Sequence, residues 1–353
     1  ILQHHRVEDR AADSILLRLF QLLSEPGHCI GALDARRQGA GEVVLLDNFS
    51  LGTPETVAHL DGDARVRLVK GDILRINELY DAFKGASGVF AIAGFLTLPL
   101  SQNPPLGLAV NVEGQVNVFE ACRYAGVKKV IFSSSIAAYG EPEGDGVIDE
   151  MSPANLAGYQ PGSMLYSCTK LIGEALCKLY SQKHGIDAVA LRYSTVYGER
   201  QHYRGVNALY IIQNYDKIMR GEAPSLPGDG SEVHDYIHVA DVARANVMAM
   251  ASDVTGEVLN TVTGVETTVK RIAEILLFPE TSRFIRESER SVDFPYCAVG
   301  LIDDDRRQHG RENCLAHCVL PCLRGPFDPN TSDPNLDRAH APHSLRPPRN
   351  PVA

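Results

Sequence analysis

The sequence predicts an α/β protein built on a doubly wound parallel sheet, with a smaller part that follows it. Five apolar runs between residues 41 and 193 have the length of strands, and helical patterns separate them. Several runs are continuously apolar rather than alternating, which is typical of parallel strands covered on both faces. Strands and helices that alternate in this way imply right-handed crossovers within one sheet.

The candidate strands are residues 42–47, 65–69, 88–93, 128–134 and 187–193. Two long helices are predicted between them, at 107–124 and 167–183, because apolar residues recur every three or four positions. The apolar face of the first helix consists of Ala109, Val112, Val116 and Phe119. That of the second consists of Leu171, Ala175, Leu176 and Leu179.

Composition restricts the class of protein. The chain has 353 residues, 44% of them hydrophobic, and a net charge of −10, which argues against a nucleic-acid binder. No run is long and apolar enough to span a membrane, and ILLRLFQLL (15–23) is not followed by a signal-peptide cleavage site. We therefore expect a cytoplasmic protein whose eight scattered cysteines are reduced thiols.

Both ends differ in character from the middle of the chain. A dinucleotide-binding fold opens with a strand, a glycine-rich turn and a helix, but residues 1–40 contain no G-x-x-G-x-x-G. Residues 278–353 are rich in Arg, Pro, His and Cys with little periodicity, so we expect a poorly ordered tail. A shifted reading frame in the gene is one hypothesis for both segments.

Three short motifs follow predicted strands, where ligands bind in open α/β sheets. Asp47 ends VVLLD and can accept the two hydroxyls of an adenosine ribose, or it can simply form a turn with the next residue. Asp72 in KGDIL has the same two interpretations. The small pair Ala93-Gly94 allows either close approach of a cofactor or tight helix packing.

The spacing Y-x3-K occurs three times, as Tyr80/Lys84, Tyr124/Lys128 and Tyr166/Lys170. Chance alone would produce it in about one chain in three of this length and composition, so position must decide. The first pair lies on a helix far from any serine cluster, and the second straddles Gly126, which indicates a helix end. Tyr166 and Lys170 share one face of a continuous helix.

The stretch VIFSSSIAAYG (130–140) ends a predicted buried strand in three serines. We expect Ser135 at the rim of the sheet, hydrogen-bonded to a substrate oxygen, although a serine-rich loop start would look the same. A phenol has a pKa of about 10, and a neighbouring lysine lowers it. Tyr166 can then take a proton from a sugar hydroxyl while hydride passes to a nicotinamide, whose ribose Lys170 holds.

The middle of the chain resembles the extended short-chain dehydrogenase/reductase family, in particular its NAD-dependent nucleotide-sugar epimerase/dehydratase group, which is UDP-glucose 4-epimerase-like. The resemblance runs from about Gly41 to Leu277 and rests on VVLLDNFS, KGDIL, NVEGQVNVFEA, FSSSIAAYG, YSCTK, LRYSTVYGERQ and GDGSEVHDYIHVADVARA. It implies a Rossmann-type doubly wound parallel sheet, with the NAD-binding domain at 41–192 and a smaller substrate-binding part at 193–277.

The resemblance also implies roles for individual residues. The catalytic residues would be Ser135, Tyr166 and Lys170. NAD would be held by Asp47 and Asn48 at the adenosine ribose, by Asp72 and Ile73 at the adenine, and by Ile92, Ala93, Gly94, Asn111, Ser133, Tyr166, Lys170 and Tyr193. The substrate would contact Ser135, Thr195 and His234.

Several positions depart from the family pattern. Ala91 stands where a histidine is usual, Thr195 where asparagine is frequent, and His234 where an arginine precedes the Asp of D-Y-I-H-V. Histidine holds a diphosphate less firmly than an arginine fork does at neutral pH. The absence of the glycine-rich motif from residues 1–40 predicts weaker cofactor binding.

Together these observations predict an NAD-dependent nucleotide-sugar epimerase that acts on a UDP-sugar and dimerises through the helices at 107–124 and 167–183. The alternatives are a dehydrogenase/reductase or dehydratase of the same fold, or a catalytically impaired homologue. A dehydratase would have an acidic residue after Ser135, where this chain has Ile136. We predict no metal site, since Cys314, His317, Cys318 and Cys322 lack paired C-x2-C spacing.

Overall fold

The computed structural model describes residues 16–20, 41–50, 54–60, 62–141, 148–198 and 209–277, and of 16–20 the backbone alone. All of them belong to one compact unit, residues 1–323. The second unit, residues 324–353, lies outside the described residues, and so does the whole tail predicted from residue 278.

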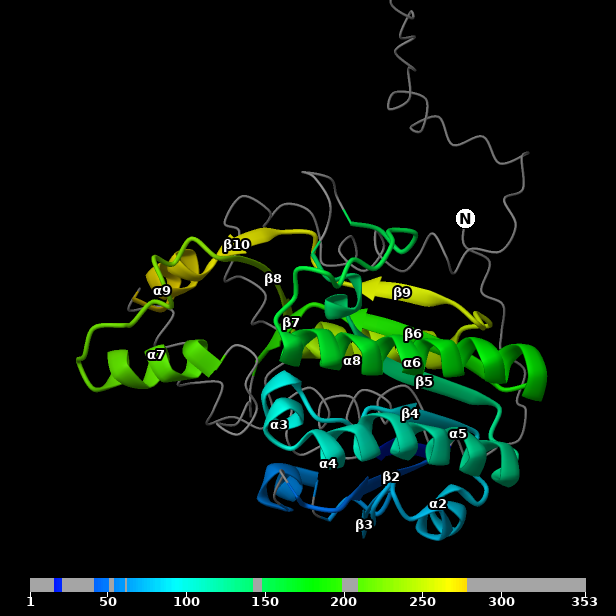
Figure 1. Ribbon diagram of the computed structural model, residues 1–353. Helices are drawn as coiled ribbons and strands as arrows, with labels where there is room; N and C mark the ends of the chain where they lie inside the picture. Colours follow the sequence, from blue (N-terminus) through cyan, green and yellow to red (C-terminus); the bar gives the residue numbers. More distant parts are fainter. Residues whose placement is uncertain are drawn as a thin grey trace, which may run out of the picture. The chain divides into compact units, whose positions relative to one another are not determined.

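A seven-stranded parallel sheet forms the centre of this unit, in the order β3-β2-β1-β4-β5-β6-β9 (Figure 1). Its strands are β1 (Leu16–Phe20), β2 (Glu42–Asp47), β3 (Val66–Lys70), β4 (Gly88–Ala91), β5 (Lys129–Ser135), β6 (Asp187–Tyr193) and β9 (Val258–Thr261). The predicted Rossmann-type sheet is therefore present, and each of the five candidate strands agrees with an observed one to within two residues at either end.

The central strand β1 comes from the segment that looked least like part of the fold. It pairs with β2 on one side and with β4 on the other, so the sheet has the first strand that a dinucleotide-binding fold needs. Sequence reasoning missed this strand because it is short, contains Arg18 and is not followed by a glycine-rich turn. Residues 21–40, where that turn would be, lie outside the described residues.

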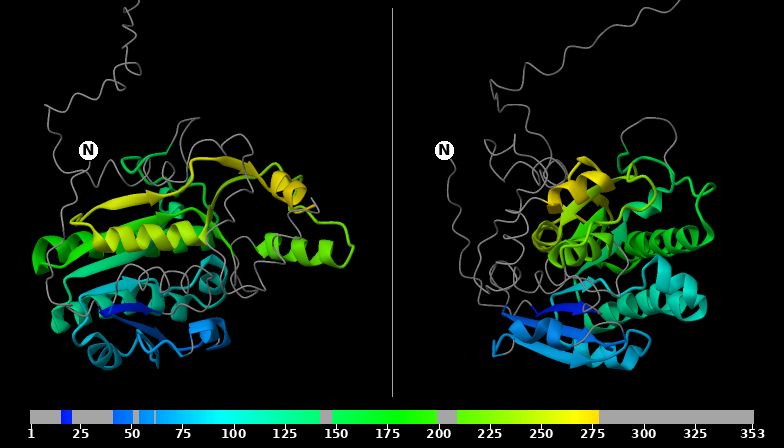
Figure 2. Two further views of the ribbon diagram at one scale, coloured as in Figure 1. Left: turned by 180° about the vertical axis from the view of Figure 1, so that it is seen from behind. Right: turned by 90° about the vertical axis from the view of Figure 1, so that its left-hand side faces the viewer.

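Helices cover both faces of the sheet, as Figure 2 shows from the side. One face packs against α2 (Ile76–Phe83), α5 (Gly114–Ala125) and α6 (Pro161–His184), and the other against the 3-10 helix η1 (Pro54–Leu60) and α8 (Val239–Ala251). Side chains of β2 alternate accordingly: Val44 and Leu46 enter the first core, and Val43 and Leu45 the second.

The helix predicted at 107–124 is interrupted. It consists of α4 (Pro104–Leu108), a π-helical turn (Ala109–Glu113) and α5, which ends at Gly126 in the left-handed conformation (φ 74°). The extra residue in the π-turn rotates α5 about its axis, so the predicted apolar face is partly wrong. Val116 is exposed, whereas Val118 and Phe119 are buried.

Helix α6 is longer than predicted and faces differently. It starts at Pro161, a residue suited to a first helical turn, and ends before Gly185 (φ 65°). The predicted apolar face is divided: Ala175 and Leu179 are exposed, whereas Leu176 is partly buried against the core. The buried side instead contains Tyr166, Lys170, Glu174 and Cys177, because the polar ones have partners in the sheet.

A second, three-stranded sheet contains β7 (Thr195–Tyr197), β8 (Val233–His238) and β10 (Glu266–Thr268) in the order β10-β8-β7. Helices α7 (Leu209–Met219) and α9 (Val269–Leu277) accompany it, around a small core at Tyr236, Ile272 and Leu276. The predicted substrate-binding part is interleaved with the large sheet, since α8 and β9 return to it. Within the described ranges, no helix is long and apolar enough to cross a bilayer.

Candidate active site

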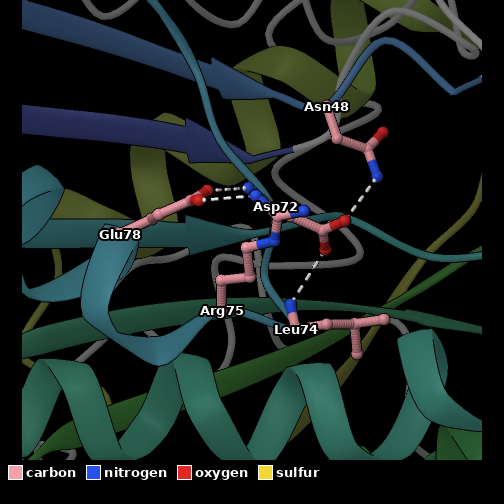
Figure 3. A network of polar contacts seen from close by, with 5 residues as sticks. All are labelled: Asn48, Asp72, Leu74, Arg75 and Glu78. Carbon is pink, nitrogen blue, oxygen red and sulfur yellow. Dashed lines mark hydrogen bonds and ion pairs between the residues drawn. The ribbon is translucent and has the colours of Figure 1, made fainter.

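The ends of β2 and β3 carry a network of polar contacts at the carboxyl edge of the sheet (Figure 3). Asn48 Nδ2 donates to Asp72 Oδ2 at 3.1 Å, which joins the two predicted cofactor segments directly. Asp47 is 2% exposed, and its Oδ1 accepts from the backbone of Phe49 at 2.5 Å. Asp47 therefore forms the turn that was the alternative interpretation, and its ribose contact stays a prediction.

The loop after β3 is held by the first turn of α2. Asp72 Oδ1 accepts from the Leu74 backbone at 2.9 Å, while Glu78 Oε2 accepts from the Asp72 backbone at 2.9 Å. Arg75 pairs with the other oxygen of Glu78 at 3.1 Å, as Figure 3 shows. Local hydrogen bonds thus fix the Asp72 carboxylate before any ligand arrives.

Among the predicted cofactor residues, Ile73 lies in the core, whereas Gly94 lies beside Asn111 and Lys170. The Ile73 side chain is 1% exposed and lies in the core, so only its backbone can serve the adenine contact. Ile92 and Ala93 are buried at the end of β4. A Cβ added at Gly94 would lie 3.3 Å from Asn111 Oδ1 and 3.9 Å from Lys170 Nζ, so this glycine borders the predicted catalytic lysine.

Asn111 clamps the bend that follows β4. Its Nδ2 donates to Phe95 O at 2.9 Å and Thr169 Oγ1 at 3.2 Å, and its Oδ1 accepts from Phe95 N at 2.6 Å. The π-turn that carries Asn111 aims it between β4 and α6. The role the structure supports for Asn111 is to hold the bend in place, and its predicted contact with NAD is untested.

Strand β5 brings its serines to the same edge. Ser135 ends the strand beside Tyr193 of β6 and caps the 3-10 helix η3 (Ile136–Tyr139), where its Oγ accepts from Ala137 N at 3.2 Å. The Ser167 hydroxyl of α6 donates to Ala137 O at 2.6 Å. This contact ties the start of α6, and Tyr166 with it, to the residues directly after Ser135.

Tyr166 and Lys170 meet Ser133 below the rim. Lys170 Nζ donates to Ser133 O at 2.8 Å and lies 5.4 Å from the centroid of the Tyr166 ring. Tyr166 and Lys170 are 7% and 9% exposed, so the lysine charge acts on the phenol with little screening by water. A lysine ammonium beside a tyrosine ring is the arrangement that the predicted proton transfer requires.

The hydroxyl of Tyr193 takes part in a hydrogen-bond chain, and the predicted contact of this residue with NAD is untested. Its hydroxyl donates to Asn246 Oδ1 at 2.9 Å and lies 3.1 Å from Ser133 Oγ. Asn246 Nδ2 donates to Val242 O, which fixes the amide with its oxygen toward Tyr193. Burial raises the pKa of Tyr193 to about 12, although both hydrogen bonds act in the opposite direction.

The predicted substrate residues lie on the small sheet. Thr195 of β7 pairs with Tyr236 of β8, and His234 lies two residues before that tyrosine. His234 Nε2 is 3.0 Å from Glu232 Oε1, and its ring is edge-on to Tyr236 at 5.6 Å. Their contacts with a substrate remain predictions, as do the roles of the residues at the rim.

The other two Tyr/Lys pairs do not share a helix face. Helix α2 ends at Phe83 before Lys84, and α5 ends before Lys128. In the described part of the chain, no group of three or more His, Cys, Asp or Glu could hold a metal. The tail cysteines and His317 lie outside that part, and the described cysteines 122, 168 and 177 are free thiols, as predicted.

Sequence reasoning missed a buried ionic group beneath the rim. Glu174 of α6 forms a two-pronged ion pair with Arg192 of β6, at 2.7 and 2.8 Å, and also accepts from Ser134 Oγ at 2.5 Å. Two signals could have revealed it. Glu174 follows Lys170 by one helical spacing of four, and Arg192 is a charged residue inside the apolar run DAVALRY.

The described residues fit a dinucleotide along this edge. The predicted donors and acceptors run from Asp47 at the end of β2 and Asp72 after β3 to Ser133 of β5 and Lys170, with small residues between them. Gly94 leaves open a position where a Cβ would crowd Asn111. A dinucleotide that passes over the end of β4 has to approach the backbone closely, and a glycine at this position allows it.

Comparison with known proteins also points to an NAD-binding protein. A sequence profile of the NAD dependent epimerase/dehydratase family matches residues 30–261, more than half of the chain. A relative from Methanocaldococcus jannaschii is 35% identical over 239 residues, which cover 67% of this chain and 73% of that protein. The UDP-glucose 4-epimerase of Mycolicibacterium smegmatis is 32% identical over 234 residues, 65% of this chain and 72% of that protein.

Solved structures have the same fold. The UDP-N-acetylglucosamine 4-epimerase of Methanobrevibacter ruminantium, in complex with UDP-N-acetylmuramic acid, is 28% identical with a TM-score of 0.66 over 74% of this chain and 81% of that one. The UDP-glucose 4-epimerase of Thermus thermophilus, in complex with NAD, is 27% identical with a TM-score of 0.64 over 74% and 82%. With its Rossmann-type sheet and its Y-x3-K helix, this chain belongs to the NAD dependent epimerase/dehydratase family.

Proposed function

We propose that the chain is an NAD-dependent epimerase of nucleotide sugars, with a UDP-sugar as substrate. The observation that carries the proposal is the meeting of Tyr166, Lys170 and the β5 serines at one edge of the sheet. Family membership and relatives that act on UDP-sugars support the substrate class. NAD, when bound, supplies a hydride acceptor beside the sugar carbon.

Tyr166, Lys170 and Ser135 have separate tasks in this reaction. Tyr166 takes the proton of the sugar hydroxyl as that carbon loses hydride, and returns it when the carbonyl is reduced again. Lys170 stabilises the Tyr166 phenolate and would hold the nicotinamide ribose. Ser135 hydrogen-bonds the same sugar oxygen in both directions. Inversion results when the opposite face of the keto sugar receives the hydride.

The proposal is tested with the full chain, purified and then denatured to release any NAD, which is quantified by absorbance and chromatography. UDP-glucose and UDP-galactose are then supplied in separate reactions, with and without added NAD, and products are separated by chromatography. We expect each sugar to yield the other with no net consumption of NAD. An oxidised or dehydrated product would identify the reaction as one of the alternatives, and a chain that neither contains nor binds NAD would disprove the proposal.

Tyr166→Phe tests the role of the phenol. It should lower kcat by about 10²- to 10⁴-fold, the usual contribution of a positioned acid or base, while the NAD content and the melting temperature stay unchanged. The control is Tyr80→Phe, which alters a tyrosine of another Y-x3-K pair and should retain full activity. Full activity of Tyr166→Phe would remove this residue from the mechanism.

We also propose a homodimer formed by α5 and α6. Their outer faces carry apolar residues that nothing in the described part of the chain covers, namely Val116 (36% exposed), Tyr124 (75%), Ile172 (41%) and Leu179 (47%). The two helices lie side by side on one face of the sheet (Figure 1), so a second copy can bury all four residues. Ile172→Glu with Leu179→Glu should give monomers by light scattering, whereas Leu226→Glu should not.

A further inference from the structure

The ion pair between Glu174 and Arg192 is the starting point. The two side chains are 8% and 10% exposed, and both carboxylate oxygens accept from the guanidinium. Burial lowers the pKa of Arg192, but the hydrogen bonds and the charge of Glu174 outweigh it and leave this pKa above its ordinary value. Arg192 therefore stays charged over the working pH range.

The pair joins three elements near the carboxyl edge of the sheet, where Tyr166, Lys170 and the β5 serines meet; this part of the carboxyl edge is called the reaction edge. Glu174 lies four residues after Lys170 on α6, so it shares the buried face of that helix. Arg192 stands opposite Ser134 in the β5-β6 ladder, and Ser134 Oγ donates to Glu174 Oε1 at 2.5 Å. One carboxylate thus connects α6, β5 and β6.

Ser134 is the link to the reacting groups. The backbone oxygen of its neighbour Ser133 accepts a hydrogen bond from the Lys170 ammonium, and its other neighbour is Ser135. A shift of Ser134 relative to α6 would therefore change the position of Ser133 and of Ser135 relative to Tyr166 and Lys170. The Arg192 guanidinium also lies 4.2 Å from the centroid of the Tyr139 ring, which belongs to the turn capped by Ser135.

Stability alone does not account for this arrangement. Taking two charges out of water costs several kcal/mol, and well-packed apolar residues of similar volume often replace such a pair without loss. Arg192 Nη1 has, in addition, no hydrogen-bond partner among the described residues. What an apolar pair cannot reproduce is directional contact to Ser134 and to the Tyr139 ring.

We propose that Glu174 and Arg192 are positioning residues, which hold the Tyr166–Lys170 face of α6 in register with the serines of β5. The inference rests on the proposed epimerase function, because register matters only if these groups act together. Neither residue contacts the substrate. Loss of the pair should therefore slow the chemical step and leave substrate binding nearly unchanged.

The test replaces both charges at once, as Glu174→Leu with Arg192→Met in the full chain. We expect a folded protein with wild-type NAD content, a kcat lowered at least about tenfold by misplacement of the reacting groups, and a KM changed less than about threefold. The pH dependence of kcat should also move upward, because Lys170 no longer sits firmly beside Tyr166. The control is Glu42→Leu with Arg67→Met, an exposed cross-strand pair at the opposite end of β2, which should match wild type.

Three outcomes separate the possibilities. If wild type does not convert any UDP-sugar, the proposed function fails first. If wild type is active and the folded double variant keeps its kcat within about twofold with the same pH profile, the positioning role alone is disproved. If the double variant does not fold, Ser134→Ala decides, since it leaves the ion pair intact: we expect kcat to fall about threefold or more with KM unchanged, and an unchanged kcat overturns the inference.

Discussion

At the scale of residues, the reaction edge is organised by hydrogen bonds whose direction can be followed from atom to atom. Tyr193 donates to Asn246, so its only proton is committed and the Ser133 hydroxyl must donate to Tyr193. Ser133 therefore offers lone pairs to whatever lies at the edge. A ligand group that donates, such as a carboxamide N–H, suits this position better than one that accepts.

The buried phenol of Tyr193 predicts a loss of stability at high pH. The unfolded phenol has a pKa of about 10, and burial raises the folded value to about 12. Its stabilising contribution is complete below pH 10 and declines between pH 10 and 12, where the unfolded state loses a proton that the folded state keeps. Urea unfolding measures the free energy of unfolding of wild type and of Tyr193→Phe. The difference between these two free energies should fall by at most about 1.4 kcal/mol per pH unit across that window. A difference independent of pH would contradict the burial of this group.

At the scale of elements, α6 is placed by close packing as well as by polar contacts. Gly173 lies directly over the Phe132 ring of β5, so the helix backbone approaches the strand without an intervening side chain. Lys170 Nζ lies 5.4 Å from the same ring. The helix that carries the Tyr/Lys pair is thus pressed against the strand that carries the serines.

Substitution of two helical glycines should separate packing from helix propensity. A Cβ at Gly173 would come within 3.0 Å of three atoms of the rigid Phe132 ring, whereas one at Gly114 would meet the flexible end of Ile73. Alanine favours a helix interior by about 1 kcal/mol, but overpacking costs about 1–3 kcal/mol. We expect Gly173→Ala to lower the free energy of unfolding clearly and Gly114→Ala to change it by less than about 1 kcal/mol. Equal effects in chemical denaturation would argue against the close contact.

The agreement between sequence and structure is also clearest for elements. Continuous apolar runs placed the strands well because parallel strands are buried on both sides. The helix faces were harder to predict, since apolar periodicity cannot distinguish a face that packs on the sheet from one that is left outside. On α6 the buried side is partly polar, and Lys170 and Glu174 can be buried there because Ser133, Ser134 and Arg192 are among their partners. Such pairings join residues far apart in sequence and leave no local pattern.

At the scale of the whole molecule, Asp235 links the two sheets. This residue of β8 accepts from Ser194 Oγ at 2.7 Å, directly after β6. It also accepts from Thr263 N and Oγ1 at 3.0 Å and from Gly264 N at 2.6 Å, directly after β9. The connection is made at the carboxyl edge, where we place the substrate.

Asp235→Ala should loosen this junction. Four donors would lose their acceptor, and a donor left without a partner costs about 1–3 kcal/mol when it is buried. We expect faster hydrogen exchange at the amides of residues 263 and 264, with β5 amides unchanged. Asp235→Asn keeps one acceptor oxygen and should lie between the two. Unchanged exchange in the alanine variant would show that the junction does not depend on this carboxylate.

The small sheet is assembled from two separate excursions of the chain. The first leaves the large sheet after β6 and returns as α8, and the second leaves after β9. Because β6 and β9 are neighbouring strands, both excursions start from adjacent points of the large sheet. Evolution can therefore remodel the small sheet without disturbing the large one, but only if both excursions change together. A recombinant that exchanged one of them would bring β8 from one parent against β10 from the other.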